Sequence, residues 1–593
     1  MRRKKDGRYI LKYAFYYLIS QLTLCFIFFS DSCSTNYLKK PLQNYKTMCG
    51  IWVYIDKNTK LTNEELYHHF MRTSHRGPDH SSFQQFSDNV FIGFHRLAIM
   101  DLSPLSNQPF VIEMPNGEVV IFVCNGEIYN YRELNEKYSL GLTRHSDCLV
   151  IPLLYKAIGM DYKRFIELFH SEINGEFSFV MTFFNPQTNR VSSVISGRDH
   201  IGIRPLYYGS YKDSVVFSSE IKSCEFFNGT IKEFNPGTIQ RFCYDDDGLM
   251  SYIDVQHFDW VYNVLSTYKT DEEHLADIKT ALTNSVLRRL TSDAPIGFLL
   301  SGGVDSSLVC SVACSLIGSG RNVRTFCCGM EGGSDLMYAR RVAEFLETDH
   351  TEVIFTAEEA LKAINDVIHT VETWDTTTIR ASVGQYLVSK FIRENTDIKV
   401  LLVGEGPDEV CSSYLFNWYA PSAEQLHYSA MEYVKDIHKF DVKRVDRCVS
   451  AFGIEARVPY LDPEFISLYW AIPPRERVPQ ERGIEKWWLR KSFDTDNGPP
   501  MLPPEVLWRK KEAFSDGISS TERSWFQTIK DYIRENYNMT EEEYYIHTFV
   551  EIFGKKRLNI VDKYWQPKWD KEGNETKGYV DPSARTLGIY NTL

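Results

Sequence analysis

The seven residues 301–307, Ser-Gly-Gly-Val-Asp-Ser-Ser, combine glycines, hydroxyls and one carboxylate in a single loop. An apolar run at 296–300 precedes the loop and is typical of a buried parallel strand. Residues 308–317 follow it with apolar side chains at helical spacing. A loop of this kind lets backbone N–H groups and hydroxyls surround an anion at the positive end of a helix. Phosphate would repel the Asp305 carboxylate unless a divalent cation lay between them. The sequence therefore predicts a site for a phosphate-bearing ligand and a metal ion.

A second loop, residues 404–409, reads Gly-Glu-Gly-Pro-Asp-Glu after an apolar run at 399–403. Its carboxylates can bind magnesium or receive an ammonium group, although alone the segment would be interpreted as a solvated acidic turn. Its place after a buried strand, paired with the first loop, favours a functional site. The expected strands and helices around both loops alternate, which predicts a doubly wound parallel sheet. The expected strands are 323–327 and 352–355, and the expected helices are 335–346, 357–369 and 381–394.

Composition excludes several classes of protein. The 593 residues include 43% hydrophobic and 24% charged residues, which is ordinary for a globular enzyme of two or three domains. The net charge of −12, without a long Lys/Arg run after residue 5, argues against nucleic-acid binding. The 13 cysteines show no Cys-x-x-Cys pair and no repeating frame, so we expect a reducing cytosol.

The first 47 residues differ from the rest. Four basic residues at positions 2–5 precede a mostly apolar stretch at 13–29. This pattern is typical of a signal peptide or a weak membrane anchor. The alternative is an upstream extension of the gene, with translation starting at Met48, and the residue after Met48 bears on that choice.

Cys49 opens a region of short alternating runs, at 51–55, 119–124, 177–183, 191–195 and 215–218, which predict antiparallel sheets. Polar clusters lie between these runs. They are His-Arg-Gly-Pro-Asp at 75–79, His-Arg-Leu-Ala-Ile at 95–99, Asn-Gly-Glu-Ile-Tyr-Asn at 125–130, Ser-Asp at 146–147 and Gly-Arg-Asp-His at 197–200. Taken singly, Cys49 would be a buried small hydrophobe, Arg96 a structural ion-pair partner and Asp147 a helix cap.

Taken together, these clusters resemble the glutaminase domain of amidotransferases that have an N-terminal nucleophile. The resemblance implies that Cys49 is the nucleophile and that its own α-amine, with a pKa near 8, is the base. It assigns Asn125 and Gly126 to the oxyanion hole and Arg96 to the α-carboxylate of glutamine. Asp147 and Glu127 would hold the α-ammonium. Because a cysteine behind 48 residues has no free amine, we expect the functional chain to begin at Cys49.

The loop at 301–307 resembles the pyrophosphate loop of ATP pyrophosphatases and lacks the lysine of the phosphate loop that hydrolyses nucleotides. With the glutaminase clusters, the chain from Met48 onward resembles the family of glutamine-hydrolysing asparagine synthetases, of the eukaryotic type. Segments that carry this resemblance are 378–382, 455–459, 485–486, 511–517, 565–569 and 581–586. We therefore expect an extension at 1–47, a glutamine amidotransferase domain at 49–255 and a synthetase domain at 260–593. The first domain should be an α+β antiparallel sandwich, and the second an α/β doubly wound parallel sheet of the ATP pyrophosphatase type.

The resemblance implies ligase activity that makes L-asparagine from L-aspartate, with ATP as substrate and Mg²⁺ as cofactor. Ammonia from glutamine would displace AMP from a β-aspartyl-AMP intermediate, after release of pyrophosphate. Asp305 and Asp408 would hold the metal, Lys486 would neutralise phosphoryl charge, and Glu405 would accept the proton of the attacking ammonia. The residues expected to bind ATP are Leu300, Ser301, Gly302, Gly303, Asp305, Ser306, Cys328, Val403, Gly404 and Lys486. Glutamine, aspartate and ATP are the expected partners, and a homodimer is an option that the sequence leaves open.

The second loop and its surroundings depart from the family pattern, and two rival hypotheses stay open. Val403 and Pro407 stand where the family has serines, and Ser412-Ser413 stand where a glycine pair is common. Loss of a hydroxyl and of a backbone donor predicts an active enzyme with weaker ATP binding. One rival is a related β-lactam-type cyclase, although such relatives lose the nucleophilic cysteine. Another is a catalytically silent, membrane-tethered binding protein.

Overall fold

The structure is a computed structural model, and it describes residues 49–87, 89–142, 146–245, 250–258, 269–494, 500–511, 517–519 and 523–577. The expected extension at 1–47, most of the segment 511–517 and the segment 581–586 lie outside these residues. The described residues all belong to one compact unit of the chain.

The alternating runs of the N-terminal half form two six-stranded sheets in which neighbouring strands pair antiparallel, as the sequence predicted. One sheet has the order β10-β8-β9-β1-β3-β2 and the other β12-β11-β7-β6-β5-β4. The strands are β1 (Gly50–Ile55), β2 (His80–Ser87), β3 (Val90–Arg96), β4 (Phe110–Glu113), β5 (Val119–Ile128), β6 (Gly175–Asn185), β7 (Arg190–Arg198), β8 (Tyr207–Tyr211), β9 (Ser214–Ser218), β10 (Ile231–Glu233), β11 (Thr238–Tyr244) and β12 (Met250–His257).

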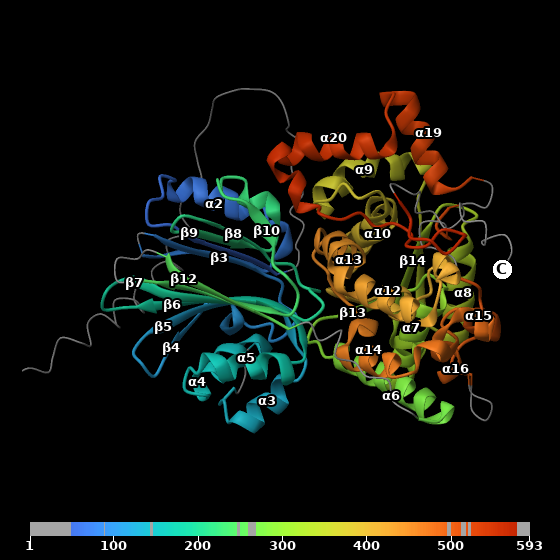
Figure 1. Cartoon of the computed structure of the whole chain (residues 1–593), viewed down its shortest axis with the longest axis horizontal. Helices are drawn as coiled ribbons and strands as arrows, with labels where there is room; N and C mark the ends of the chain where they lie inside the picture. Colours follow the sequence, from blue (N-terminus) through green and yellow to red (C-terminus); the bar gives the residue numbers. More distant parts are fainter. Residues whose placement is uncertain are drawn as a thin grey trace, which may run out of the picture. The chain divides into compact units, whose positions relative to one another are not determined.

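Side-chain alternation explains how these two sheets stack. In β1, Ile51, Val53 and Ile55 pack into the core between the sheets, while Trp52 and Tyr54 face helix α2 (Asn63–Met71). The opposite sheet packs on α3 (Tyr131–Tyr138), α4 (Val150–Ala157) and α5 (Tyr162–Ser171). Figure 1 shows α2 outside one sheet and these three helices outside the other. The arrangement is a four-layer α+β sandwich.

The C-terminal half contains a five-stranded parallel sheet with the order β15-β14-β13-β16-β17. Its strands are β13 (Ile296–Leu299), β14 (Arg324–Gly329), β15 (Asp349–Ile354), β16 (Val400–Leu402) and β17 (Glu455–Arg457). The strand order runs outward from β13 in both directions, so the doubly wound prediction is confirmed. The loops at 301–307 and 404–409 follow β13 and β16, which are neighbours, at the point where the order reverses.

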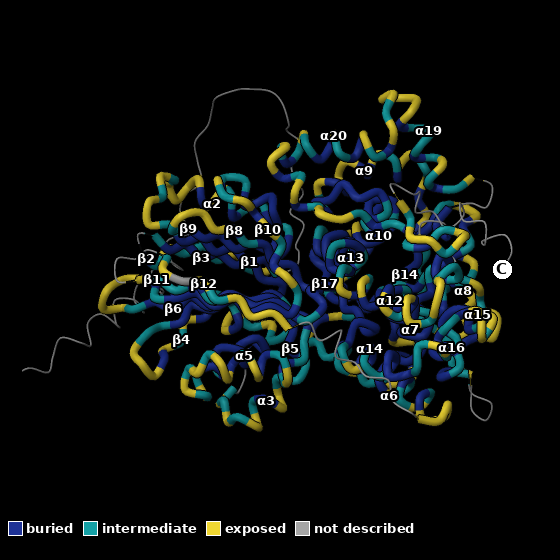
Figure 2. The backbone as a smooth tube through the Cα atoms, in the orientation of Figure 1, coloured by how far each residue is buried: buried dark blue, intermediate teal, exposed yellow. Residues whose placement is uncertain are grey.

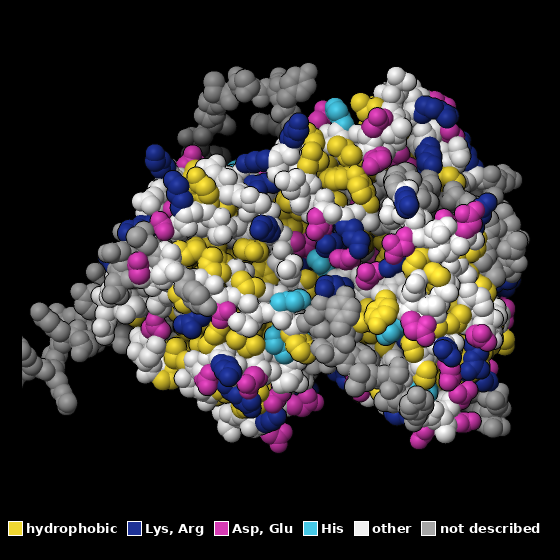
Figure 3. Space-filling model, in the orientation of Figure 1, with side chains coloured by type: hydrophobic (Ala, Val, Ile, Leu, Met, Phe, Trp, Pro, Cys, Tyr) yellow, Lys and Arg dark blue, Asp and Glu magenta, His cyan; other side chains and the backbone are white. Residues whose placement is uncertain are grey.

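Helices surround this sheet, and Figure 2 shows the sheets of both halves largely buried, with exposed residues gathered in loops and on outer helix faces. The α-helices of this half are α6 (Asp271–Arg289), α7 (Val304–Ile317), α8 (Ser334–Leu346), α9 (Ala357–Val371), α10 (Thr376–Asn395), α11 (Pro407–Val410), α12 (Ala423–Asp436), α13 (Asp441–Ser450), α14 (Pro463–Trp470), α15 (Pro479–Arg482), α16 (Trp487–Ser492), α17 (Pro504–Leu507), α19 (Trp525–Tyr537) and α20 (Glu541–Phe553). In the part of the chain that the structure describes, no helix has the length and apolarity needed to span a membrane. On the face drawn in Figure 3, basic and acidic side chains are interspersed.

Candidate active site

Cys49 lies immediately before β1 and beside the end of β3. Gly50 pairs with His95, so the same register continued by one residue sets Cys49 opposite Arg96. The Leu97 backbone N–H lies 3.3 Å from the Cys49 sulfur, and the thiol lies 3.6 Å from the Leu97 carbonyl oxygen. Burial raises the pKa of the Cys49 thiol to about 12. A thiol in this setting needs a base before it can act as a nucleophile.

Asn125 and Gly126 lie on β5, on which Ile121 and Val123 face the first sheet. Because alternate residues of a strand share a face, Asn125 points in the same direction. Its side chain is fully buried, and both its amide nitrogen and its oxygen lack a hydrogen-bond partner in the described residues. Gly126 has φ +138°, and a Cβ there would lie 2.0 Å from the Glu176 carbonyl oxygen, so no other residue fits. An unpaired buried amide beside a required glycine fits a site that receives a ligand oxygen.

The Arg96 guanidinium is held by the loop that follows β3. Nη1 donates to the Ser103 carbonyl oxygen at 2.7 Å and to Asn107 Oδ1 at 2.8 Å, and Nη2 donates to the Asp101 carbonyl oxygen. These bonds orient a planar, always charged group that suits a carboxylate.

Asp147 and Glu127 form an acidic pair near the end of β5. Asp147 Oδ2 accepts the Ile128 backbone N–H at 2.6 Å, and burial raises the pKa of Asp147 to about 6. Burial, with the Asp147 charge, also raises the pKa of Glu127, whose carboxylate lies 3.7 Å from the Arg457 guanidinium. Ser146, not Asp147, caps the turn that follows.

The loop at 301–307 is ordered by its own hydroxyl groups. The Ser301 backbone N–H donates to Ser306 Oγ at 3.1 Å, and the two serine oxygens lie 3.0 Å apart. Gly302 has φ +74°, and a Cβ there would overlap the backbone of α8. Gly303 precedes α7, and Asp305 lies in the first turn of that helix. The N-terminal end of α7 thus faces the loop after β16, since a Cβ on Gly404 would lie 2.7 Å from the Ser306 nitrogen.

Asp305, Asp408 and Lys486 come together between the two loops. Lys486 Nζ donates to Asp305 Oδ2 and to Asp408 Oδ1, each at 2.5 Å, and Lys511 also donates to Asp408. Burial acts to raise the pKa of Asp408, but Lys486 and Lys511 outweigh it and hold that pKa well below its usual range. Lys486 has φ +58°, an uncommon backbone conformation for a residue other than glycine. The second Asp305 oxygen, Oδ1, is buried and has no hydrogen-bond partner among the residues that the structure describes.

Glu405, in the loop after β16, lies close to Arg444. Its Oε1 accepts hydrogen bonds from Arg444 Nη1 and from Gln385 Nε2, each at 3.2 Å. Burial raises the pKa of Glu405, and the Arg444 charge opposes the change. A carboxylate whose pKa is raised is suited to accept a proton at neutral pH.

The two loops and Lys486 line one cavity. The predicted residues in its wall are Ser301, Gly303, Asp305, Ser306, Gly404, Glu405, Asp408 and Lys486. Leu300, Gly302, Cys328 and Val403 are not in that wall, and Leu300, Cys328 and Val403 are buried core residues. Sequence reasoning assigned no role to Arg444, Gln385 and Lys511, which the structure adds. Only Lys511 had a sequence signal, because it begins one of the segments that carry the resemblance.

Comparison with known families agrees with both halves of the structure. The profile of the glutamine amidotransferase domain family matches residues 48–258, and the profile of the asparagine synthase family matches residues 277–428 and 419–572. The class is thus a glutamine amidotransferase domain joined to an asparagine synthase domain.

Whole-chain relatives narrow the class. The asparagine synthetase [glutamine-hydrolyzing] of Gallus gallus is 36% identical over 92% of this chain and 99% of its own length. The Homo sapiens protein of the same name is 34% identical over the same shares. A glutamine phosphoribosylpyrophosphate amidotransferase from B. subtilis covers 46% of this chain and 64% of its own, with 16% identity and a TM-score of 0.29, a likeness too low to support a conclusion. The chain belongs to the family of glutamine-hydrolysing asparagine synthetases.

Proposed function

We propose that this protein synthesises L-asparagine from L-aspartate, ATP and glutamine, as an ATP-dependent carbon–nitrogen ligase working in a reducing cytosol. The observation that carries the proposal is a pair of buried polar groups, one in each half, that have no hydrogen-bond partner within the described part of the chain. The Asn125 amide lies in the first half, and Asp305 Oδ1 lies in the second. Buried polar atoms without partners are uncommon in native proteins and fit positions that a substrate or ion completes.

In the first half, the Cys49 sulfur attacks the side-chain amide carbon of glutamine. The tetrahedral oxyanion receives hydrogen bonds from Asn125 and Gly126, ammonia leaves with the proton taken from the thiol, and water then hydrolyses the thioester to glutamate. Arg96 holds the α-carboxylate of glutamine, and Asp147 with Glu127 holds the α-ammonium. Arg96 supplies the positive charge, and Asp147, with a pKa raised to about 6, supplies a negative charge at neutral pH.

The base for the thiol follows from what surrounds it. In the described residues, the hydrogen-bond partners of the Cys49 sulfur are the backbone groups of Leu97, and neither is a base. A free α-amine on Cys49 has a pKa near 8 and reaches the thiol on the same residue. We therefore propose that the active chain begins at Cys49.

In the second half, the β-carboxylate of aspartate attacks the α-phosphorus of ATP to give β-aspartyl-AMP, and pyrophosphate leaves. Lys486 stabilises the charge on the phosphoryl oxygens. Two carboxylates with one unpartnered oxygen suit Mg²⁺, which takes few protein ligands when phosphates supply the others. Asp305 and Asp408 would hold it, and when bound it would neutralise pyrophosphate charge.

Ammonia crosses to the second half and attacks the acyl carbon of the adenylate, and AMP leaves. Glu405 accepts the proton that the attacking nitrogen loses, which its raised pKa favours. Water must be excluded at this stage, because hydrolysis would return aspartate.

The test is formation of asparagine and AMP from aspartate and ATP, with either glutamine or ammonia as nitrogen source. Chains that start at Met1 and at Cys49 are compared, with Cys49→Ala as the matched control. We expect ammonia-dependent synthesis in all three and glutamine-dependent synthesis only in the unsubstituted chain that starts at Cys49. Glutamine hydrolysis by an intact Met1 chain would contradict the role of the free amine. Absence of AMP in every case would contradict the ligase.

A further inference from the structure

Arg76 joins the carbonyl group of Cys49 to the synthetase half. Its side chain is fully buried, and its Nε donates to the Cys49 carbonyl oxygen at 2.9 Å. Its Nη1 and Nη2 donate to the two carboxylate oxygens of Asp446, at 2.9 and 3.1 Å. Nη1 also lies 2.7 Å from Glu220 Oε1 and 3.0 Å from Ser450 Oγ. The Arg76 guanidinium group therefore binds the backbone of Cys49 and also a helix of the synthetase half.

The helix that Arg76 binds is α13, and another residue of this helix lines the synthetase cavity. Asp446 and Ser450 face Arg76, while Arg444 on the same helix donates to Glu405 at 3.2 Å. Residues 442–450 of α13 are all buried. α13 therefore carries the contact with Arg76 and the contact with Glu405 on different residues of one buried helix.

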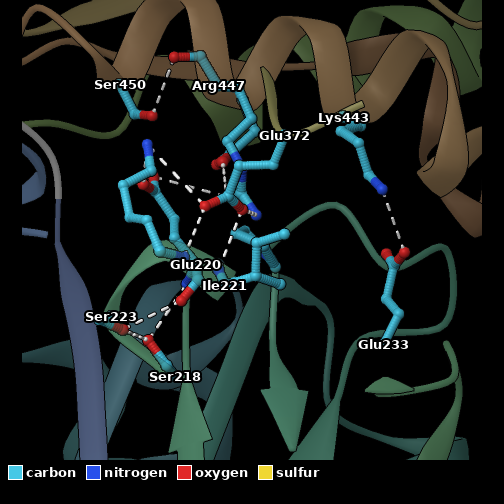
Figure 4. Close-up of polar contacts among 12 residues, drawn as sticks. Ser218, Glu220, Ile221, Ser223, Glu233, Glu372, Lys443, Arg447 and Ser450 are labelled. Atoms are coloured by element: carbon cyan, nitrogen blue, oxygen red, sulfur yellow. Dashed lines mark hydrogen bonds and ion pairs between the residues drawn. The ribbon is translucent and has the colours of Figure 1, made fainter. Parts of the chain in front are cut away.

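Further charged groups stabilise the contact between the glutaminase half and the synthetase half. Glu372 accepts the backbone N–H groups of Ile221 and Lys222, each at 3.0 Å, from the turn that follows β9. Arg447 lies 3.5 Å from Glu372 and 3.7 Å from Glu220. Figure 4 shows Glu220, Arg447 and Glu372 converging, with the Lys443–Glu233 pair set apart from them.

We propose that Arg76 and Asp446 are positioning residues for the glutaminase reaction, so that a synthetase-half side chain sets the geometry of Cys49. The inference rests on the proposed role of Cys49 as nucleophile. A hydrogen bond to the Cys49 carbonyl group fixes the orientation of the peptide unit that starts at the Cys49 Cα atom, and this Cα atom carries the side chain with the sulfur. A misplacement of about 1 Å in a reacting group costs on the order of 100-fold in rate.

The test is Asp446→Asn, made in the form of the protein that hydrolyses glutamine. The substitution keeps the shape of the side chain and removes the charge of the two-pronged partner, while Glu220 stays beside Nη1. We expect kcat for glutamine hydrolysis to fall by about 10- to 100-fold, with KM for glutamine changed less than about 2-fold. Ammonia-dependent asparagine synthesis should stay within about 2-fold, because Asp446 touches neither the cavity wall nor Glu405.

Lys443→Met is the matched control. It breaks another ion pair between α13 and the glutaminase half, at 3.3 Å, without touching Arg76. Glu233 keeps Arg198 and His438 as partners, so the loss is compensated. We expect both activities to remain near those of the unsubstituted protein. As a second variant, Arg76→Lys keeps the charge but loses the planar fork, and should resemble Asp446→Asn.

Normal glutamine hydrolysis in Asp446→Asn would overturn the inference. Equal losses in Asp446→Asn and Lys443→Met would also overturn it, because any weakening of the interface would then suffice. Parallel loss of ammonia-dependent synthesis would show a structural role instead. If the unsubstituted protein fails to hydrolyse glutamine, the proposed role of Cys49 fails first, a result that the variants do not affect.

Discussion

Replacing Asn125 by leucine should move activity and stability in opposite directions. Asn125 is fully buried, and its amide nitrogen and oxygen have no partner in the described residues. Removal of one oxyanion-hole donor costs about 2.7–4 kcal/mol of transition-state stabilisation, or on the order of 100- to 1,000-fold in kcat. An unsatisfied buried polar group costs about 1–3 kcal/mol of folding stability. Leucine has a similar shape, so the variant should be as stable as the parent or more stable.

The assay measures glutamine hydrolysis, ammonia-dependent asparagine synthesis and the urea midpoint for each protein. Gln108→Met is the matched control, because Gln108 is also a buried carboxamide, but its groups are paired. Its Nε2 donates to the Cys124 carbonyl oxygen at 3.0 Å, and its Oε1 accepts the Cys124 N–H at 2.7 Å. Gln108→Met leaves the Cys124 N–H and carbonyl groups without these hydrogen bonds, and it should lower the free energy of unfolding by about 2 kcal/mol. A loss below about 10-fold in Asn125→Leu, or destabilisation similar to that of Gln108→Met, would refute the reasoning.

Three other substitutions test separate parts of the structure. Burial raises the pKa of Asp147 to about 6, so its carboxyl group is protonated below that pH. KM for glutamine should therefore rise about 10-fold for each pH unit below 6. Asp147→Asn should remove this pH dependence when KM is measured over a pH series. Gly404→Ala places a Cβ 2.7 Å from the backbone of α7 and should lower both glutamine- and ammonia-dependent synthesis by at least about 10-fold, while glutamine hydrolysis persists in a direct assay. Ser412 has φ +54° and a buried hydroxyl that has no partner in the described residues. Ser412→Gly should therefore raise the free energy of unfolding by up to about 1 kcal/mol, which a Tm measurement would show as an increase. A pH-independent KM in the unsubstituted protein would contradict the argument for Asp147. Unchanged synthesis in Gly404→Ala or a lowered Tm in Ser412→Gly would contradict the other two.

In the first half, the predicted runs correspond to β1, β5, β6, β7 and β9, whereas β2, β3, β4, β8, β10, β11 and β12 were not predicted. In the parallel sheet only β17 was not predicted, and its charges explain why. The run predicted at 119–124 forms the core of β5, and the alternating strands and helices after residue 296 gave the parallel sheet. By contrast, β17 contains Glu455 and Arg457 in three residues, so it carries no apolar signal. Both charges are buried: Arg457 and Glu455 pair with each other at 3.0 Å, and Arg204 and Glu127 of the first half lie 3.5 Å from Glu455 and 3.7 Å from Arg457. A strand whose charges are compensated partly from another half of the chain cannot be predicted from its own apolar pattern.

The candidate site shows the same division. Residues that follow a strand, such as Asp305 and Glu405, could be placed from local pattern, because parallel strands bring their carboxyl ends to one edge. The partner of Arg76 could not, since Asp446 lies 370 positions away on a helix with no motif. Gln385 and Arg444 are similar cases, because each lies within a helix and reaches Glu405 only through packing. Sequence pattern therefore places groups relative to their own strand, and tertiary packing decides which groups meet.

Pro407 in the second loop and Val403 just before it, which both replace serines, have different structural consequences. Pro407 is the first residue of α11, a position where the backbone N–H has no partner within the helix, so proline costs little there. Val403 is fully buried, and its backbone N–H donates to the Arg457 carbonyl oxygen at 3.1 Å, which a serine would retain. The change at 403 therefore removes only a hydroxyl, from a residue outside the cavity wall. Pairing of Lys486 with Asp408 does not depend on either position, and Ser413 adds a hydrogen bond of 2.5 Å to the same carboxylate. The geometry thus favours a functional second loop, with any loss of ATP affinity confined to contacts of residue 403.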